Sequence, residues 1–78
     1  MTDTSKRTAR FIRIKTIIKK TGLSRASIYN KLNKDSKYHD PEFPEQIKIG
    51  GGAVVWIEHE IDDWMTTQIR NSRESAII

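Results

Sequence analysis

The hydrophobic residues that follow Ile14 recur at a helical spacing, which is then interrupted. Ile14, Ile17 and Ile18 fall at i, i+3 and i+4, and this spacing places them on one stripe of a helix. Gly22 can end that helix, because glycine enters the left-handed conformation without steric cost. Leu23 would then fold back onto Ile18. The pattern predicts a short helix followed by a sharp turn.

A second short helix is indicated directly after this turn. Ser24 suits the N-cap position, where its hydroxyl accepts a backbone N–H two or three residues further on. Leu23 and Ile28 occupy the two positions of a hydrophobic staple, and Leu32 continues the apolar stripe. Two helices joined by a short turn that contains glycine form a helix-turn-helix. The stretch from Ile14 to Lys34 therefore predicts this motif.

The next part of the chain loses its helical period. Residues 35–46 contain both prolines and predict a loop, with Phe43 as its anchor in the core. Ile47–Ile57 contains two β runs around Gly50–Gly52, and glycine supplies the positive φ values of tight hairpins. A nucleotide-binding loop is the alternative, but the glycine spacing of such loops is missing and no helix follows directly. We therefore expect a hairpin, which beside a helix-turn-helix is a wing.

A last helix is expected over Glu58–Asn71, because apolar residues recur there at i, i+3, i+4 and i+8: Ile61, Trp64, Met65 and Ile69. Acids near its start and arginines near its end suit the helix macrodipole. Ser72–Ile78 is expected to fray, with Ile77 and Ile78 exposed unless a partner covers them.

These elements predict a mainly α fold with a small β-hairpin, a winged helix-turn-helix with a C-terminal helix. We divide the chain into a flexible basic arm (1–10), a winged helix-turn-helix domain (11–70) and a frayed tail (71–78). Phe11–Ile14 would enter the fold as an extended lead with Arg13 pointing outward. The predicted core consists of Ile14, Ile17, Ile18, Leu23, Ile28, Leu32, Phe43, Ile47, Ile49, Val54, Trp56, Ile61, Trp64 and Met65.

Positive charge is concentrated in the first half of the 78-residue chain, whose net charge is +4. Residues 1–34 carry ten Lys or Arg and one acid, a net +9, whereas residues 35–78 carry four Lys or Arg and nine acids, a net −5. This distribution is expected when one face meets a polyanion. A membrane-surface helix is the competing use of such charge, but it would need a broad apolar face with Trp or Phe.

The polar face of the second helix points to DNA. No acid lies between Arg25 and Lys34, whereas a merely solvated helix usually mixes acids with its lysines. Arg and Asn read base edges, and Lys, Ser and Tyr hold phosphates. The predicted DNA-contacting residues lie on this helix and on the wing: Ser24, Arg25, Ala26, Ser27, Tyr29, Asn30, Lys31, Asn33, Lys34, Lys48, Gly51 and Gly52. Further candidates for backbone contacts are Lys20, Lys37, Tyr38 and the arm residues Lys6, Arg7 and Arg10, although an inert tail would explain the arm equally well.

No catalytic or cofactor site is expected. His39 and His59 are isolated from other metal-ligating residues, and the chain has no cysteine, which excludes disulfides and thiolate zinc sites. A chain of this length offers no evident cleft that would orient a catalytic triad. No signal peptide or apolar run of about 18 residues is visible, so we expect a cytoplasmic protein without enzyme activity.

Two stretches together resemble one family of regulators. The motifs T-G-L-S-R-A-S-I-Y (21–29) and W-I-E-H-E-I-D-D-W (56–64) are similar to those of the AlpA family of prophage transcriptional regulators, related to excisionases and to MerR-type winged helix-turn-helix proteins. The resemblance extends over about residues 11–69. It implies that the recognition helix carries Ser24, Arg25, Ser27 and Tyr29, that Gly50–Gly52 form the wing turn, and that Trp56, Ile61 and Trp64 are core positions. The stretch 35–42 is longer than in the shorter family members.

The resemblance implies a bacterial, nucleoid-associated regulator of prophage or mobile-element origin. Double-stranded DNA is the expected partner, with RNA polymerase or an integrase as possible protein partners, and a monomer that assembles on DNA is the expected state. One alternative is an excisionase that bends attachment-site DNA. The other is a small inhibitor or adaptor that binds a protein through its acidic last helix or its C-terminal end.

Overall fold

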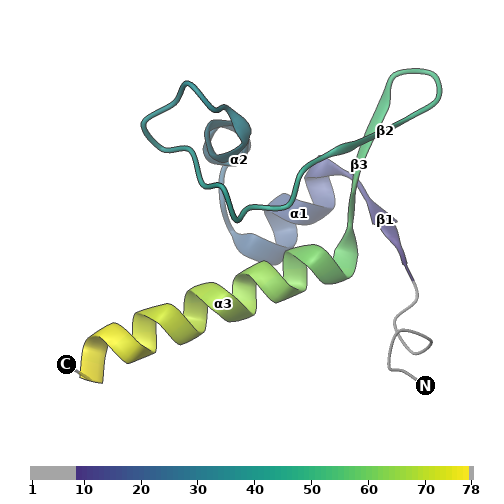
Figure 1. Cartoon of the computed structure of the whole chain (residues 1–78). Helices are drawn as coiled ribbons and strands as arrows, with labels where there is room; N and C mark the ends of the chain where they lie inside the picture. The colour runs from purple at the N-terminus through teal and green to yellow at the C-terminus, as the bar shows by residue number, and fades with distance from the viewer. Residues whose placement is uncertain (1–8, 78) are drawn as a thin grey trace.

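The structure, a computed structural model, describes residues 9–77 and the side chains of residues 9–75 (Figure 1). Its elements in chain order are β1 (Phe11–Ile12), α1 (Ile14–Thr21), α2 (Arg25–Leu32), β2 (Ile47–Ile49), β3 (Ala53–Ile57) and α3 (Glu58–Ile77). Figure 1 shows α2 and the tip of the β2–β3 hairpin on one side of the molecule, with α3 along the opposite side. The predicted mainly α fold with a β wing is confirmed.

The turn between α1 and α2 has the predicted left-handed residue. Gly22 has φ 77°, and its N–H donates to the Ile18 carbonyl at 2.8 Å. Thr21 also closes the turn, because its hydroxyl donates to the Ile17 carbonyl at 2.8 Å and accepts from the Leu23 N–H at 3.1 Å. These bonds satisfy backbone groups that a helix end leaves unpaired. They set where α2 begins relative to α1.

Ser24 caps α2 as predicted, and its hydroxyl oxygen accepts the Ser27 N–H at 3.1 Å. We expect Ser24→Ala to lower the free energy of unfolding by about 1 kcal/mol, because that N–H loses its partner. Urea denaturation followed by circular dichroism measures the change. Ser72→Ala, an exposed serine within α3, is the matched control and should cost nothing. Equal losses in the two variants would contradict a capping role for Ser24.

The three strands form one antiparallel sheet in the order β1-β3-β2. In the hairpin, Gly51 and Gly52 have φ 62° and 79°, and the Ala53 N–H donates to the Gly50 carbonyl at 3.2 Å. Positive φ at both central residues is the requirement of a type I′ turn, whose twist matches that of the flanking strands. The glycine-rich stretch is therefore a wing, as its composition predicted.

β1 adds a strand that the sequence did not reveal. Phe11 pairs with Ile57 and Ile12 with Trp56, so the expected extended lead is part of the sheet. The Arg10 carbonyl, just before β1, also accepts the N–H of Glu58 at 2.8 Å. Pairing on one side with β1 and on the other with β2 makes β3 the central strand, which joins the wing to the start of α3.

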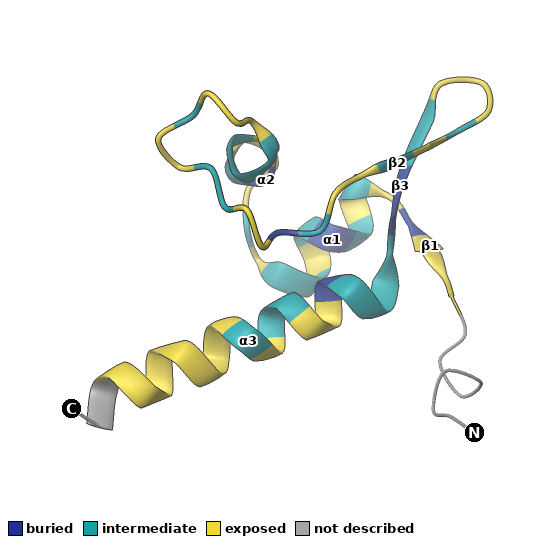
Figure 2. Cartoon of the chain, viewed as in Figure 1, coloured by how far each residue is buried: buried dark blue, intermediate teal, exposed yellow. Residues whose placement is uncertain are grey.

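The core lies where α1, α2, β3 and the first turns of α3 meet (Figure 2). Its buried residues are Ile12, Ile17, Ile28, Phe43, Trp56 and Ile61, with Ile14, Ile18, Leu23, Leu32, Val54, Trp64 and Met65 packed against them. Two predicted core residues, Ile47 and Ile49, lie outside this cluster and are only half-buried. They belong to an edge strand, where one side has no neighbour to cover it. Ile12 and Val55 are buried although they were not predicted to be.

α3 is longer than the sequence predicted. It runs to Ile77, and the predicted end at Asn71 is wrong because no glycine or proline follows to stop the helix. From Thr66 onward, every described side chain except that of Thr67 is exposed. Fraying of this end stays a prediction, as does the division into arm, domain and tail. Residues 1–8, with most of the proposed arm, and Ile78 lie outside the described residues.

Candidate nucleic-acid interface

The outward face of α2 has the chemistry of a DNA-binding surface. The helix contains no acid. Among the predicted contacts in this region, those exposed to solvent are Ser24, Arg25, Ala26, Tyr29, Asn33 and Lys34, and those half-buried are Ser27, Asn30 and Lys31. Small side chains at its start allow a close approach to another surface, and the longer polar ones surround them. Most of the predicted contacts in and beside α2 are thus open to solvent.

Arg25 is the first residue of α2 and makes no hydrogen bond or ion pair with another described residue. A cation at this end opposes the helix macrodipole, whose positive pole lies at the N-terminus. Arg25 therefore contributes nothing evident to the stability of α2. Its charge and the N-terminal end of the helix add up to a positive site that would attract an anion.

The wing residues lie at or near the tip of the hairpin. Lys48, Gly51 and Gly52 are all exposed, and Lys48 pairs with Val54 in the ladder. No side chain is present at the two glycines, so the backbone of the tip can approach another surface closely. Since α2 and this tip lie on the same side of the molecule (Figure 1), one partner could contact both.

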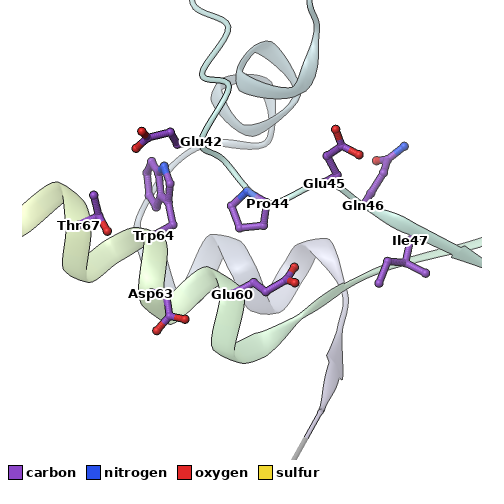
Figure 3. A pocket seen from close by; sticks show the side chains of 9 residues that line it. All are labelled: Glu42, Pro44, Glu45, Gln46, Ile47, Glu60, Asp63, Trp64 and Thr67. Carbon is purple, nitrogen blue, oxygen red and sulfur yellow. The ribbon is translucent and has the colours of Figure 1, made fainter. Parts of the chain in front are cut away.

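An acidic hollow lies away from α2, between the loop that precedes β2 and α3. Its volume is about 600 Å³, and Figure 3 shows carboxylates around it from both segments: Glu42, Glu45, Glu60 and Asp63. Pro44, Ile47 and Trp64 provide its apolar surface. Carboxylates repel phosphates through their like charge. The carboxylates therefore disfavour DNA at this hollow.

Lys20 is ion-paired within the fold, whereas the sequence analysis considered it as a candidate for a phosphate contact. Its ammonium group donates to Glu58 at 3.1 Å and lies 2.9 Å from the Asp62 carboxylate, so it joins α1 to α3. Hydrogen bonds to Asp62 and then to Glu58 raise the pKa of Lys20 above its ordinary value. Its positive charge is matched by carboxylates within the fold, which disfavours a contact to phosphate.

We expect Lys20→Met to lower the free energy of unfolding by about 1 kcal/mol at neutral pH, a size typical of partly exposed ion pairs. Because the folded state raises the pKa of Lys20, this contribution persists below the ordinary value of 10.5 and is lost as the pH rises through the raised pKa. Urea denaturation of both proteins across that range measures it. Lys15→Met, an exposed lysine of the same helix, is the control. A loss of stability in Lys20→Met that grows as the pH rises would contradict this account.

Lys31 points partly toward α3. Its ammonium nitrogen lies 5.4 Å from the centroid of the Trp64 ring, close enough for a cation–π contact. Trp64 is in turn held by Phe43, whose ring centroid is 5.0 Å away in an edge-to-face arrangement, and by a 3.0 Å hydrogen bond from its Nε1 to Asp40. Sequence reasoning missed Asp40. Its other carboxylate oxygen accepts the Glu42 N–H at 2.9 Å, which closes an Asx turn. The Asp40-Pro41 pair favours the start of a turn and could have drawn attention to it.

A family model, the prophage CP4-57 regulatory protein (AlpA), matches residues 10–69 of the chain. The chain belongs to the AlpA family. The AlpA match begins just before β1 and ends within α3, so it covers the helix-turn-helix, the wing and the packed part of α3. The exposed end of α3 lies beyond it.

Two relatives of this AlpA-family chain illustrate the range of the similarity. It is 41% identical over 61 residues to the DNA-binding transcriptional activator AlpA of Escherichia coli (strain K12), covering 78% of this chain and 87% of that protein. It is 37% identical over 60 residues to the uncharacterized protein ORF88 of Enterobacteria phage P4, covering 77% of this chain and 61% of the phage protein. The chain thus spans less than two thirds of the phage protein's length. No solved structure matches the chain significantly.

Other kinds of site have little support in the part of the AlpA-family chain that the structure describes. Within residues 9–77, no three His, Asp or Glu side chains are arranged to hold a metal ion. No helix in that range is both long and apolar enough to cross a bilayer. The side of α2 and the wing is the surface on which a functional proposal can be built.

Proposed function

We propose that the protein is a sequence-specific DNA-binding regulator of transcription, of prophage or mobile-element origin. The observation that carries the proposal is the acid-free outward face of α2, with Arg25 at its start and the wing on the same side (Figure 1). Arg25 makes no ion pair or hydrogen bond with another of the residues that the structure describes. The E. coli relative is named as a DNA-binding transcriptional activator, and its similarity supports the same class of function here. Catalysis has no part in the proposal.

In this proposal α2 enters the major groove with its N-terminal residues toward the base edges, as recognition helices do. The wing, from Lys48 to Gly52, lies on the flanking backbone or minor groove. Lysines and arginines on this side neutralise phosphates and supply affinity that falls as the salt concentration rises. The contact residues are those predicted from the sequence, without Lys20.

The proposal is tested by titrating labelled promoter, attachment-site and coding fragments of host and prophage DNA with the purified protein at two salt concentrations. We expect tight binding to one fragment that survives the higher salt, because base contacts add to the phosphate contacts. Weak binding that is equal on all fragments and disappears at the higher salt would contradict a sequence-specific function.

The identity of the bound fragment separates regulation from recombination. Selection of a promoter, with a change in transcript level when the protein is added to an in vitro transcription reaction, supports the regulator. Selection of an attachment site with bending of the fragment would instead indicate an excisionase. A monomer that assembles on DNA in the cytoplasm, with RNA polymerase or an integrase as protein partner, completes the proposal.

A further inference from the structure

A small hollow lies beside α2, among residues that the sequence predicted to contact DNA. Its volume is about 190 Å³, and it is lined by Ser27, Asn30 and Lys31 from α2 and by Tyr38 from the following loop. Every one of these side chains carries a hydrogen-bond donor, and no carboxylate is among them. A hollow lined in this way suits an anion better than a cation or an apolar group.

Ser27 and nearby lysines support binding of an anion in this hollow. The Ser27 oxygen accepts a hydrogen bond from the Ser24 hydroxyl at 3.1 Å, so the hydroxyl hydrogen of Ser27 is left to donate elsewhere. The Lys37 ammonium nitrogen lies 5.2 Å from the centroid of the Tyr38 ring, which places a positive charge beside the hollow. The Lys31 side chain lines the hollow, and its ammonium group lies over the Trp64 ring. Neither lysine has an acidic partner among the described residues.

The loop that carries Tyr38 is held in place by hydrogen bonds. The Asp35 N–H donates to the Asn33 side chain at 2.9 Å, and the Tyr38 N–H donates to the Ser36 hydroxyl at 3.0 Å. The loop then returns to α2, where the Asp40 N–H donates to the Lys31 carbonyl at 3.0 Å. Tyr38 is nevertheless 61% exposed. An exposed aromatic side chain on a fixed loop is ready to contact a partner without further ordering.

We propose that this hollow receives one phosphate group of the DNA backbone, and that Lys37 and Tyr38 are DNA-contacting residues. The inference rests on the proposed function and deepens it. A donor-lined hollow that includes Lys31 in its lining and has the Lys37 ammonium group beside its Tyr38 favours a charged phosphate over a neutral base edge. Ser27, Asn30 and Lys31 then hold the backbone, and base reading belongs to the N-terminal end of α2, at Arg25 and Ala26.

The test measures the affinity of Lys37→Ala and Tyr38→Phe for the selected fragment and for random DNA over a range of salt concentrations. We expect Lys37→Ala to reduce the slope of log K against log salt by about 1, because one phosphate contact is lost. Tyr38→Phe removes only a hydroxyl and should weaken binding about threefold to tenfold with the slope unchanged. Both variants should keep the ratio between selected and random DNA. Arg73→Ala, an exposed charge on the far part of α3, should change nothing.

A second measurement locates the phosphate. Phosphates of the selected fragment are replaced one at a time by neutral methylphosphonate, and one replacement should weaken the wild-type protein while having little further effect on Lys37→Ala. Selective binding by the wild type together with unchanged affinity and slope in both variants would overturn this inference alone. A loss of discrimination in Tyr38→Phe would also overturn it, because it would make the hollow a base-reading site. No DNA binding by the wild type would instead remove the proposed function.

Discussion

Replacing Trp56 with alanine should lower the free energy of unfolding by about 3–5 kcal/mol. Trp56 is fully buried at the centre of the core, on the strand that pairs with both β1 and β2. Its removal leaves a cavity that the surrounding helices can close only in part. For a domain of 78 residues, total stability is about 4–12 kcal/mol, so much of the variant should be unfolded at 37 °C. Urea denaturation followed by circular dichroism measures the loss.

Two comparisons show whether burial is the cause. Phe11→Ala removes an aromatic side chain from β1 that is 54% exposed, and it should cost well under half as much. Trp56→Phe should also cost less than Trp56→Ala, since the ring fills most of the space. Trp56→Phe loses no hydrogen bond to a described residue either, because the buried indole N–H of Trp56 has no partner among them. A loss in Phe11→Ala as large as in Trp56→Ala would contradict this account of the core.

The helix-turn-helix could be predicted because its signals are local. Apolar residues at helical spacing, a glycine at the turn and a serine cap each depend on a few neighbouring residues, and the structure confirms Gly22 and Ser24 in these roles. The wing was predictable for the same reason, because its run of glycines is a local signal for a tight turn. The structure confirms positive φ at Gly51 and Gly52. Features that depend on a short segment can be predicted without knowing how distant segments pack.

β1 could not be predicted, because its stability depends on a distant strand. Two residues are too few to show the period of a strand, and the pairing of β1 with β3 places Ile12 in the core cluster. The half-exposure of Ile47 and Ile49 has the same origin, since the order of the strands decides which of them is an edge. The sequence shows hydrophobic residues but not which elements will cover them.

Lys20 shows the corresponding limit for the candidate site. The charge map assigned it to the DNA-binding half, but whether a lysine is neutralised depends on which helix packs beside it. Glu58 lies 38 positions away in sequence from Lys20, and only the packing of α1 on α3 brings them together. Arg25 has no such partner in the described chain, so its assignment to the interface stays a prediction that the fold permits.

Arg25→Ala should weaken binding to the selected DNA fragment by about 1–3 kcal/mol, or about 5- to 150-fold. Arg25 begins α2, is exposed and makes no ion pair or hydrogen bond with another described residue. Its guanidinium group can therefore donate two parallel hydrogen bonds to a guanine edge. The fold should not suffer, because removing a cation from the N-terminus of a helix relieves its macrodipole. Titration of the selected fragment and of random DNA, with a thermal melt of each protein, measures both effects.

Arg25→Lys separates the two possible roles of this side chain. Lysine keeps the positive charge but cannot form the rigid pair of parallel hydrogen bonds. If Arg25 reads a base, Arg25→Lys should retain most of the affinity for random DNA and lose much of the preference for the selected fragment. If Arg25→Ala weakens both DNAs equally and Arg25→Lys restores both, Arg25 holds only a phosphate. In that case base reading by α2 would have to come from other residues on its outward face, such as Asn30, and the assignment of Asn30 to a backbone contact would fail with it.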